Sequence, residues 1–311
     1  MRNKTNQTKK WVDQVVEKIL FFMALLSASF IVMVVIVIIE RGLSPFFSDN
    51  DGLGPVNLLR FLTGIVYLDG PTFASNAYGI GYLIISTLYI ALLSLMIAMP
   101  ISIFSALFIA KIAPKPLGNT LRTITEILAA IPSIVYGLFG AGVILDLVYN
   151  LSLIVGVQSS AGFSVLSTVI VLAIMIIPTM TVIAEVAIRA VQKELIQGSL
   201  ALGATTTQTN FKVVLASAKS GIFTAAILGV GRALGEATAV SLVAGSRRSG
   251  ISFALFETTA TLTSTMLQGM KETVGLDYTI RFSVGLVLMI IILLVNFILN
   301  FVKSKVGRVH V

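Results

Sequence analysis

Six long apolar stretches, separated by polar and turn-forming segments, dominate the pattern of hydrophobic positions along the chain. Their approximate bounds are Ile19–Ile39, Ile80–Ala110, Thr125–Val148, Phe163–Ala187, Gly221–Ala244 and Phe282–Val302. Each reaches the roughly 20 residues that a helix needs to cross the apolar core of a bilayer. We therefore expect an all-α, polytopic membrane protein with six transmembrane helices.

The polar segments divide the chain into successive regions. We expect an N-terminal tail (1–17), a first transmembrane helix (18–40), an external loop (41–79), a transmembrane domain (80–305) and a C-terminal tail (306–311). A cleaved signal peptide is the alternative for the first apolar stretch, although its apolar region would span only about 7 to 15 residues. Residues 190–220 connect the fourth and fifth spans.

The distribution of charge changes the meaning of a basic composition. Only 12% of the residues are charged and the net charge is +8; soluble domains carry about 25% charged residues. With both termini cytoplasmic, the cytoplasmic segments hold fourteen Lys and Arg residues and the external segments six, the bias expected of membrane proteins. We therefore expect a multi-pass protein of the plasma or inner membrane, in contact with lipid, with no nucleic acid as a partner. Cysteine is absent, which excludes disulfides and thiolate sites.

The connection between the fourth and fifth spans carries the most informative motif. Leu195 and Leu202, with Gly198 and Ser199 between them, fall at helical spacings of three and four, and Gly203 permits a turn that a side chain would obstruct. We expect a short amphipathic helix, a turn and a second helix leading into the membrane. Its small residues would let the first helix enter a partner's groove; a helix lying flat on the lipid surface is the alternative.

The fifth span contains two charged residues, Arg232 and Glu236, in the segment from Gly229 to Thr238. Residues four apart share one helix face and can pair. A charge at the middle of a membrane helix costs about 2.5 to 3.5 kcal/mol on insertion scales, so such residues face the bundle interior or an aqueous path. Either the pair only fixes helix packing, or it gates the path of a tetrahedral oxyanion that the Arg232 guanidinium binds.

Further polar residues of the spans are candidates for lining the path. They are Ser133 and Tyr136 in the third span and Thr238 and Ser241 in the fifth. Pro132 would disrupt backbone hydrogen bonding beside the first two. Glu126 is expected at the cytoplasmic end of the third span, either as a solvated helix-end charge or as a gate contact. Glu185 ends the fourth span and is expected to extend to the interface.

The connecting loop resembles the signature of the membrane permease subunits of ABC importers, which reads Glu-Ala-Ala, three residues, Gly, nine residues, Ile, one residue, Leu-Pro. The spacing is intact here, with Gln197, Gly198, Ser199, Gly203, Val213, Leu215 and Ala216 at the matching positions. The resemblance implies a type I (MetI-like) permease core whose coupling helix docks into a separate cytoplasmic ATPase. The docking residues it implies are Gln197, Gly198, Ser199, Ala201, Leu202, Gly203, Ala204 and Leu215. Gln197 and Ala216 replace the family's Glu and Pro, which removes a charge and a rigid bend.

Three further segments are similar to the permeases of phosphate-specific (Pst) importers. They are residues 126–140, 201–205 and 231–240, and Val243–Ser246 favours the C-type (PstC-like) subunit. The resemblance covers about Tyr78 to Lys303. It implies that the chain supplies half of a path for inorganic phosphate. The implied partners are a second, A-type (PstA-like) permease in a heterodimer, two ATPase subunits (PstB-like) and an external phosphate-binding protein (PstS-like).

The chain lacks a Gly-x-x-x-x-Gly-Lys-Ser/Thr phosphate loop, so we expect ATP to be bound by the partner ATPase, and no cofactor or metal in this chain. Within transport, the alternatives are an A-type subunit or a permease for sulfate, molybdate or phosphonate. An ion channel would not need a docking loop. An integral membrane phosphatase would need an acid–base or nucleophilic group of residues, yet the single histidine is His310. We therefore do not expect an enzyme.

Overall fold

The computed structural model describes residues 2–50, 52–68 and 77–306, and within these ranges it is helical, with isolated β-bridges but no strand. Six helical segments are long and apolar enough to cross a membrane, which confirms the predicted all-α fold and the number of spans. Their bounds are Asp13–Phe47, Gly81–Ile112, Ser133–Val155, Val165–Arg189, Thr206–Gly235 and Gly275–Lys305. The C-terminal tail, apart from Val306, lies outside the described residues.

The described residues form helices along both halves of the chain. The N-terminal half contains α1 (Arg2–Phe47), α2 (Leu58–Thr63), α3 (Gly81–Leu107), α4 (Lys115–Ala130), α5 (Ser133–Phe139) and α6 (Leu145–Val155). The C-terminal half contains α7 (Val165–Arg189), α8 (Lys193–Ala201), α9 (Thr206–Thr209), α10 (Leu215–Gly235), α11 (Thr238–Ser241), α12 (Leu262–Leu267) and α13 (Gly275–Val306). Three π-helical turns interrupt this order, at Phe108–Ile112, Gly140–Ile144 and Asn210–Val214.

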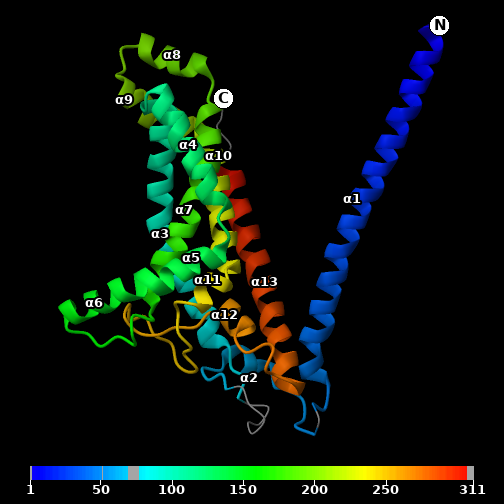
Figure 1. Ribbon diagram of the computed structural model, residues 1–311, viewed down its shortest axis with the longest axis vertical. Coiled ribbons are helices and arrows are strands. Elements are labelled where there is room, and N and C mark those ends of the chain that lie inside the picture. The colour runs from blue at the N-terminus through cyan, green and yellow to red at the C-terminus, as the bar shows by residue number, and fades with distance from the viewer. Residues whose placement is uncertain (1, 51, 69–76, 307–311) are drawn as a thin grey trace.

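The centre of the bundle is formed by α3, α7 and α10, which run side by side along its long axis (Figure 1). Small polar side chains join the first two helices: Ser94 donates to the Val169 carbonyl at 3.3 Å and Ser102 to the Ile177 carbonyl at 3.1 Å. Gly229 of α10 packs on Met180 of α7. Small residues and interhelical hydrogen bonds hold membrane helices together because lipid gives no hydrophobic drive for helix association.

The third apolar stretch is not one helix, so the predicted span Thr125–Val148 is wrong in its continuity. α4 ends at Ala130 because Pro132 lacks an amide donor and forces Ile131 into an extended conformation, with φ −63° and ψ 129°. The chain restarts at Ser133 as α5 and continues through a π-helical turn into α6. α6 projects from the side of the bundle (Figure 1).

The fifth apolar stretch is also divided, so the prediction of one helix over Gly221–Ala244 is wrong. α10 ends at Gly235, and Glu236 is extended, with φ −75° and ψ 118°. The short helix α11 follows after Ala237. The third and fifth apolar stretches thus both contain a break. Such breaks are tolerated in a membrane where neighbouring protein groups form hydrogen bonds with the backbone groups that the break frees.

The first helix stands apart from the rest. The C-terminal end of α1 contacts α13, and toward its N-terminus α1 diverges from the bundle (Figure 1). At the contact, the Ser283 hydroxyl donates to the Gly42 carbonyl at 2.7 Å, and a Cβ at Gly42 would lie 2.9 Å from the Phe282 carbonyl. The start of α1, the end of α13 and the loop carrying α8 all lie at the same end of the molecule (Figure 1).

Candidate functional site

The connection between α7 and α10 forms the tip of the bundle at the end where α1 begins (Figure 1). α8 ends at Ala201, and Gly203 adopts a left-handed φ of 86°, a conformation that favours glycine. Thr205 then starts α9 with a capping box, in which its hydroxyl accepts from the Gln208 amide and the Gln208 side chain accepts from the Thr205 amide. The predicted order of helix, turn and second helix is present.

One face of α8 is open. Leu195, Gly198 and Leu202 recur at steps of three and four and are exposed, Leu202 to 91%. A Cβ at Gly198 or Gly203 would meet nothing within 4 Å. Leaving leucine side chains in water forgoes roughly 1.5 to 3 kcal/mol each, so this leucine face is suited to burial in a partner.

The other side of the loop faces the bundle. Ile196 and Leu215 pack on a buried cluster that includes Val214, and the Ser199 hydroxyl lies 2.9 Å from that of Thr209. Ala204 is half-buried. Of the residues predicted to dock, Gln197, Gly198, Ala201, Leu202 and Gly203 are exposed. Ser199, Ala204 and Leu215 are instead half-buried, and Leu215 packs on the cluster.

Arg232 and Glu236 do not pair with each other, so the predicted ion pair is wrong. The Arg232 guanidinium donates to the Thr179 hydroxyl of α7. The Glu236 carboxylate accepts from the Ala239 amide at 3.0 Å. The spacing of four places two residues on one face only in a continuous helix, and α10 ends at Gly235 between them.

Glu236 fixes the shape of the break. Its side chain caps the start of α11, while its carbonyl accepts from the Thr263 hydroxyl of α12 at 2.7 Å. The candidates Thr238 and Ser241 form α11 itself, and the Ser241 hydroxyl donates to the Thr238 carbonyl at 2.8 Å. These bonds satisfy backbone groups that the interrupted helix leaves without intrahelical partners.

The two breaks meet where α5 crosses α11. The Tyr136 hydroxyl donates to the Leu128 carbonyl at 2.7 Å and so bridges the Pro132 break. A Cβ at Gly137 would lie 2.9 Å from the Ala239 Cα, so only glycine permits this crossing distance. Ser133 begins α5 and is half-buried. The structure thus brings the candidates of the third and fifth spans into neighbouring elements.

The surface beside Arg232 is uncovered. A Cβ at Gly231 or Gly235 would meet nothing within 4 Å, whereas Gly229, one turn earlier, packs tightly on α7. An arginine between an α7 hydroxyl and an uncovered glycine surface can accept an anion or a partner from the open side.

Glu126 and Glu185 differ from their predicted settings. Glu126 lies within α4, before the helix ends, and pairs with Arg122 at 2.8 Å, with both side chains exposed. Glu185 does not extend to the interface: it is only 2% exposed and pairs with Arg189. The Arg189 guanidinium also donates to the Ile109 carbonyl at 3.4 Å. Sequence alone gave no signal for this burial, because Arg189 follows Glu185 at a spacing common on exposed helices.

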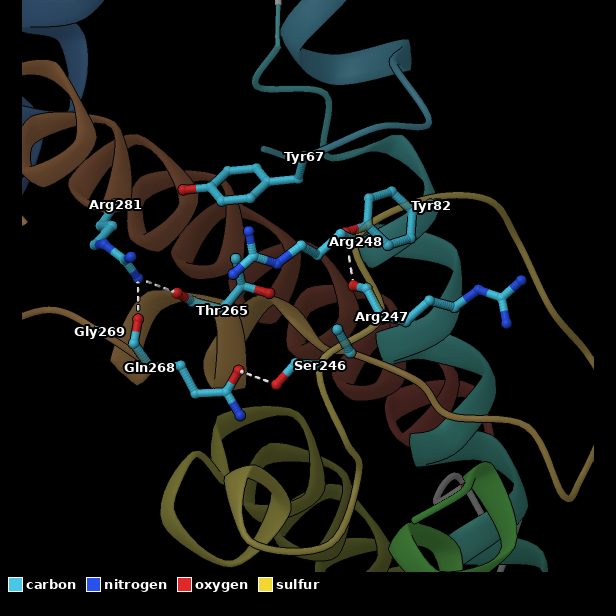
Figure 2. A pocket seen from close by; sticks show the side chains of 10 residues that line it. Tyr67, Tyr82, Ser246, Arg247, Arg248, Thr265, Gln268, Gly269 and Arg281 are labelled. Carbon is cyan, nitrogen blue, oxygen red and sulfur yellow. Dashed lines mark hydrogen bonds between the residues drawn. The ribbon is translucent and has the colours of Figure 1, made fainter. Parts of the chain in front are cut away.

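Sequence reasoning also missed a polar pocket at the opposite end of the bundle from α8 (Figure 2). Its lining includes the three arginines Arg247, Arg248 and Arg281, which come from a loop and from α13. Outside the pocket, hydrogen bonds from Ser252 and then Arg247 hold the pKa of the Glu257 carboxyl below its usual range. Among the described residues, no group of three or more His, Cys, Asp and Glu side chains is placed to hold a metal ion.

Broken membrane helices that meet in a polar crossing are typical of transporters. The chain belongs to the family of binding-protein-dependent transport system inner membrane components, whose family profile matches residues 98–308. That membership makes it a multi-pass transport permease.

Relatives with similar sequences cover three quarters or more of the chain. A probable ABC transporter permease protein, YqgH, of Bacillus subtilis is 34% identical over 91% of this chain and 88% of its own length. A probable phosphate transport system permease protein, PstC, of Methanocaldococcus jannaschii is 31% identical over 99% of both chains. PstC of Pasteurella multocida is 32% identical over 75% of this chain and 78% of its own.

Solved structures show the same fold. A subunit of a bacterial alginate ABC transporter, in complex with its periplasmic protein, covers 97% of this chain and 99% of its own, with a TM-score of 0.65 and 15% identity. A chain of the MetNI methionine ABC transporter covers 74% of this chain and 95% of its own, with a TM-score of 0.53 and 21% identity. The type I importer permease fold predicted from the sequence is therefore confirmed.

Proposed function

We propose that this chain is the C-type permease subunit of an ATP-driven importer of inorganic phosphate, and that it forms half of the translocation path. The observation that carries the proposal is the similarity to a protein named as a phosphate transport permease along 99% of both chains. Because this similarity extends over nearly the whole chain, it includes both the coupling loop and the segment around Arg232.

Arg232 is the residue that best suits a phosphate oxyanion in this path. Its guanidinium is held by Thr179 of α7 and lies beside Gly231 and Gly235, at which added side chains would meet nothing within 4 Å. Arginine presents several donors in a planar fork that matches phosphate geometry. Glu236, which caps α11, keeps the break open beside Arg232. Ser133, Tyr136, Thr238 and Ser241 supply hydroxyls along the same crossing.

The leucine face of α8 is proposed to dock into a groove of a separate ATPase. Leu195 and Leu202 are the exposed apolar anchors, and Gly198 leaves room between them. Docking helices in grooves use anchors at such helical spacings. In this orientation the α8 loop and both chain termini are cytoplasmic, and the arginine pocket is external. The ATPase binds ATP, and this chain needs no cofactor of its own.

The remaining partners complete an import machine. We propose a PstA-like permease against the uncovered surface beside Arg232, two PstB-like ATPase subunits at the cytoplasmic end and a PstS-like binding protein at the external end. The chain then performs transport and no chemical conversion. The segments 1–17, 18–40, 41–79, 80–305 and 306–311 are proposed as the tail, first span, external loop, permease domain and second tail.

Labelled phosphate uptake by the complete complex in proteoliposomes tests this function. We expect uptake that requires ATP and that is reduced more by unlabelled phosphate than by sulfate. Stronger competition by sulfate would instead support the second candidate, a permease for another oxyanion.

The role of Arg232 is tested in the same assay. Loss of a charged hydrogen-bonding group costs about 1.5 to 3 kcal/mol, so Arg232→Ala should reduce phosphate uptake roughly 10- to 150-fold. The control is Arg60→Ala, which removes an exposed arginine from α2 and should leave uptake unchanged. Normal uptake by a well-expressed Arg232→Ala complex would refute the role of this arginine.

A further inference from the structure

The pocket at the external end is a separate polar site whose lining does not include Arg232. Its volume is about 290 Å³. Arginines and hydroxyl-bearing residues dominate its lining, which consists of Tyr67, Tyr82, Ser246, Arg247, Arg248, Ala260, Thr265, Gln268, Gly269 and Arg281. The pocket thus combines positive charge with neutral hydrogen-bond donors, the chemistry that binds oxyanions.

Arg281 forms a fixed wall of this pocket. It is 1% exposed, and its guanidinium donates to the Thr265 and Gln268 carbonyls at the end of α12. Gly269 adopts a φ of 71°, and a Cβ there would lie 3.3 Å from the Arg281 guanidinium. The end of α12 therefore orients the Arg281 charge, and the glycine leaves space beside it. A carboxylate oxygen of Glu272 lies 3.9 Å from the same Cβ position.

Arg248 and Arg247 have different orientations although they are neighbours in the sequence. Figure 2 shows Arg248 extending toward Thr265, which Arg281 reaches from the other side. Arg247 extends away from them (Figure 2) and pairs with Glu257 at 2.7 Å. Arg247 contributes its carbonyl, which accepts from the Tyr82 hydroxyl at 3.1 Å. The side chain of Arg248 is exposed at the mouth, whereas Arg281 is buried at the wall.

Hydrogen bonds connect the pocket to the break in the fifth span. The Gln268 amide donates to the Ser241 carbonyl of α11 at 3.3 Å, and its oxygen accepts from the Ser246 hydroxyl at 3.2 Å. At the other end of α12, Thr263 donates to the Glu236 carbonyl. α12 and Gln268 therefore contact both the arginine pocket and the break beside Arg232.

We infer that this pocket is a second site for a phosphate oxyanion, which binds at the external end between Arg248 and Arg281 before it reaches Arg232. The inference rests on the proposed function, because it takes the same substrate and the same external orientation. Arg281 supplies a positioned charge, Arg248 closes on the anion from the mouth, and Thr265 and Gln268 supply neutral polar groups. The recessed Arg281 and the small volume suit an inorganic anion better than a protein segment.

Direct binding to the complete complex without its binding protein tests the inference. Labelled phosphate is equilibrated with complexes in detergent, and the dissociation constant is measured in the Arg232→Ala background to remove the inner site. We expect saturable binding there, and Arg248→Ala should raise the dissociation constant about tenfold or more, since a charged hydrogen bond is lost. Arg248→Lys should recover part of the affinity.

Arg247→Ala is the matched control, because it removes the neighbouring arginine that points away and pairs with Glu257. It should change the dissociation constant less than about twofold, since Arg247 contributes its backbone carbonyl to the lining while its guanidinium points away and is neutralised by Glu257. The thermal stability of the complex is measured alongside, so that a folding defect in Arg248→Ala is distinguished from a loss of binding. If Arg247→Ala and Arg248→Ala raise the dissociation constant equally, phosphate responds only to the general positive potential of this surface, and the proposed site is overturned.

Other outcomes separate the possible sources of the oxyanion. If Arg248→Ala releases a bound phospholipid in native mass spectrometry and leaves phosphate binding unchanged, the pocket holds a lipid headgroup and the inference of a free-phosphate site is overturned. If only the affinity for the binding protein falls, the pocket receives an acidic side chain of that partner, which overturns the inference equally. Wild-type uptake of phosphate with no binding change in Arg248→Ala would refute this site and leave the proposed function intact.

Discussion

The crossing of α5 and α11 can be tested by adding a single methyl group. A Cβ at Gly137 would lie 2.9 Å from the Ala239 Cα and 2.8 Å from a Leu242 methyl group. The leucine end can move, but the Ala239 contact is with backbone, so Gly137→Ala must displace α5 or α11. Overpacking of this kind costs about 1 to 3 kcal/mol. We expect a lower unfolding temperature and reduced uptake, because the displaced helices carry Tyr136 and Thr238.

Gly142→Ala provides the matched control on the same helical segment. A Cβ at Gly142 would meet nothing within 4 Å, so this substitution changes only the helix propensity, by up to about 1 kcal/mol in favour of alanine. The gain in helix propensity is common to both variants. The difference between their free energies of unfolding therefore isolates the cost of the clash, about 1 to 3 kcal/mol.

The assay is the apparent unfolding temperature of the purified complex at one fixed scan rate, because large membrane complexes unfold irreversibly. Uptake is measured on the same preparations. Equal unfolding temperatures for Gly137→Ala and Gly142→Ala, with equal uptake, would refute the close crossing and with it the argument that the two breaks meet.

Three further predictions concern the ends of the bundle. Leu202→Asp should leave the unfolding temperature unchanged, since the side chain is 91% exposed, but should weaken ATPase association in pull-down measurements; undiminished association would contradict docking through this face. Glu185→Ala removes the buried carboxylate that pairs with Arg189, whose side chain is 40% exposed and can rehydrate. We expect the free energy of unfolding to fall by about 1 to 3 kcal/mol, measured by thermal unfolding; an unchanged stability would show that the pair does not stabilise the protein. The lowered pKa of Glu257 means that its pairing with Arg247 stabilises the loop above the unfolded pKa, and that this stabilisation is lost as the pH falls through the folded pKa. Smaller amide protection factors in the loop at acidic pH, after correction for the intrinsic exchange rate, would show it, and protection factors that do not change with pH would contradict it.

The sequence predicted the number of spans well, because the transfer of about 20 apolar residues to lipid depends on composition alone. It did not predict the breaks after Ala130 and Gly235. Pro132 and Gly235 are both compatible with a kinked but continuous membrane helix, and only contacts distant in sequence decide otherwise. The bond from Thr263 to Glu236 is one such contact. The predicted Arg232–Glu236 pair failed for the same reason, since it assumed the helix that the break removes.

The candidate site was predicted best where it depends on local spacing. Leu195, Gly198 and Leu202 form the open face of α8 as the spacing predicts, because a helix periodicity fixes which residues share a face. Which side of that helix faces the bundle depends on the packing of Ile196 on residues such as Val214. The arginine pocket was missed because Arg248 and Arg281 are far apart in the chain and were counted only among the six basic residues of the external segments.

The π-helical turn at Asn210–Val214 and α10 form a single rod from the docking loop to the break. These elements run without interruption from Asn210 to Gly235, a length of roughly 40 Å at about 1.5 Å per residue. Val214 and Ala218 anchor the rod against the core at the loop end, and Arg232 lies in its last turn. A helix transmits a displacement along its axis with little loss, whereas the extended backbone at Glu236 does not continue it. A movement of the α8 loop that is transmitted along this rod would therefore reach Arg232 before it reaches α11, so the relative motion would fall at the break between Arg232 and α11.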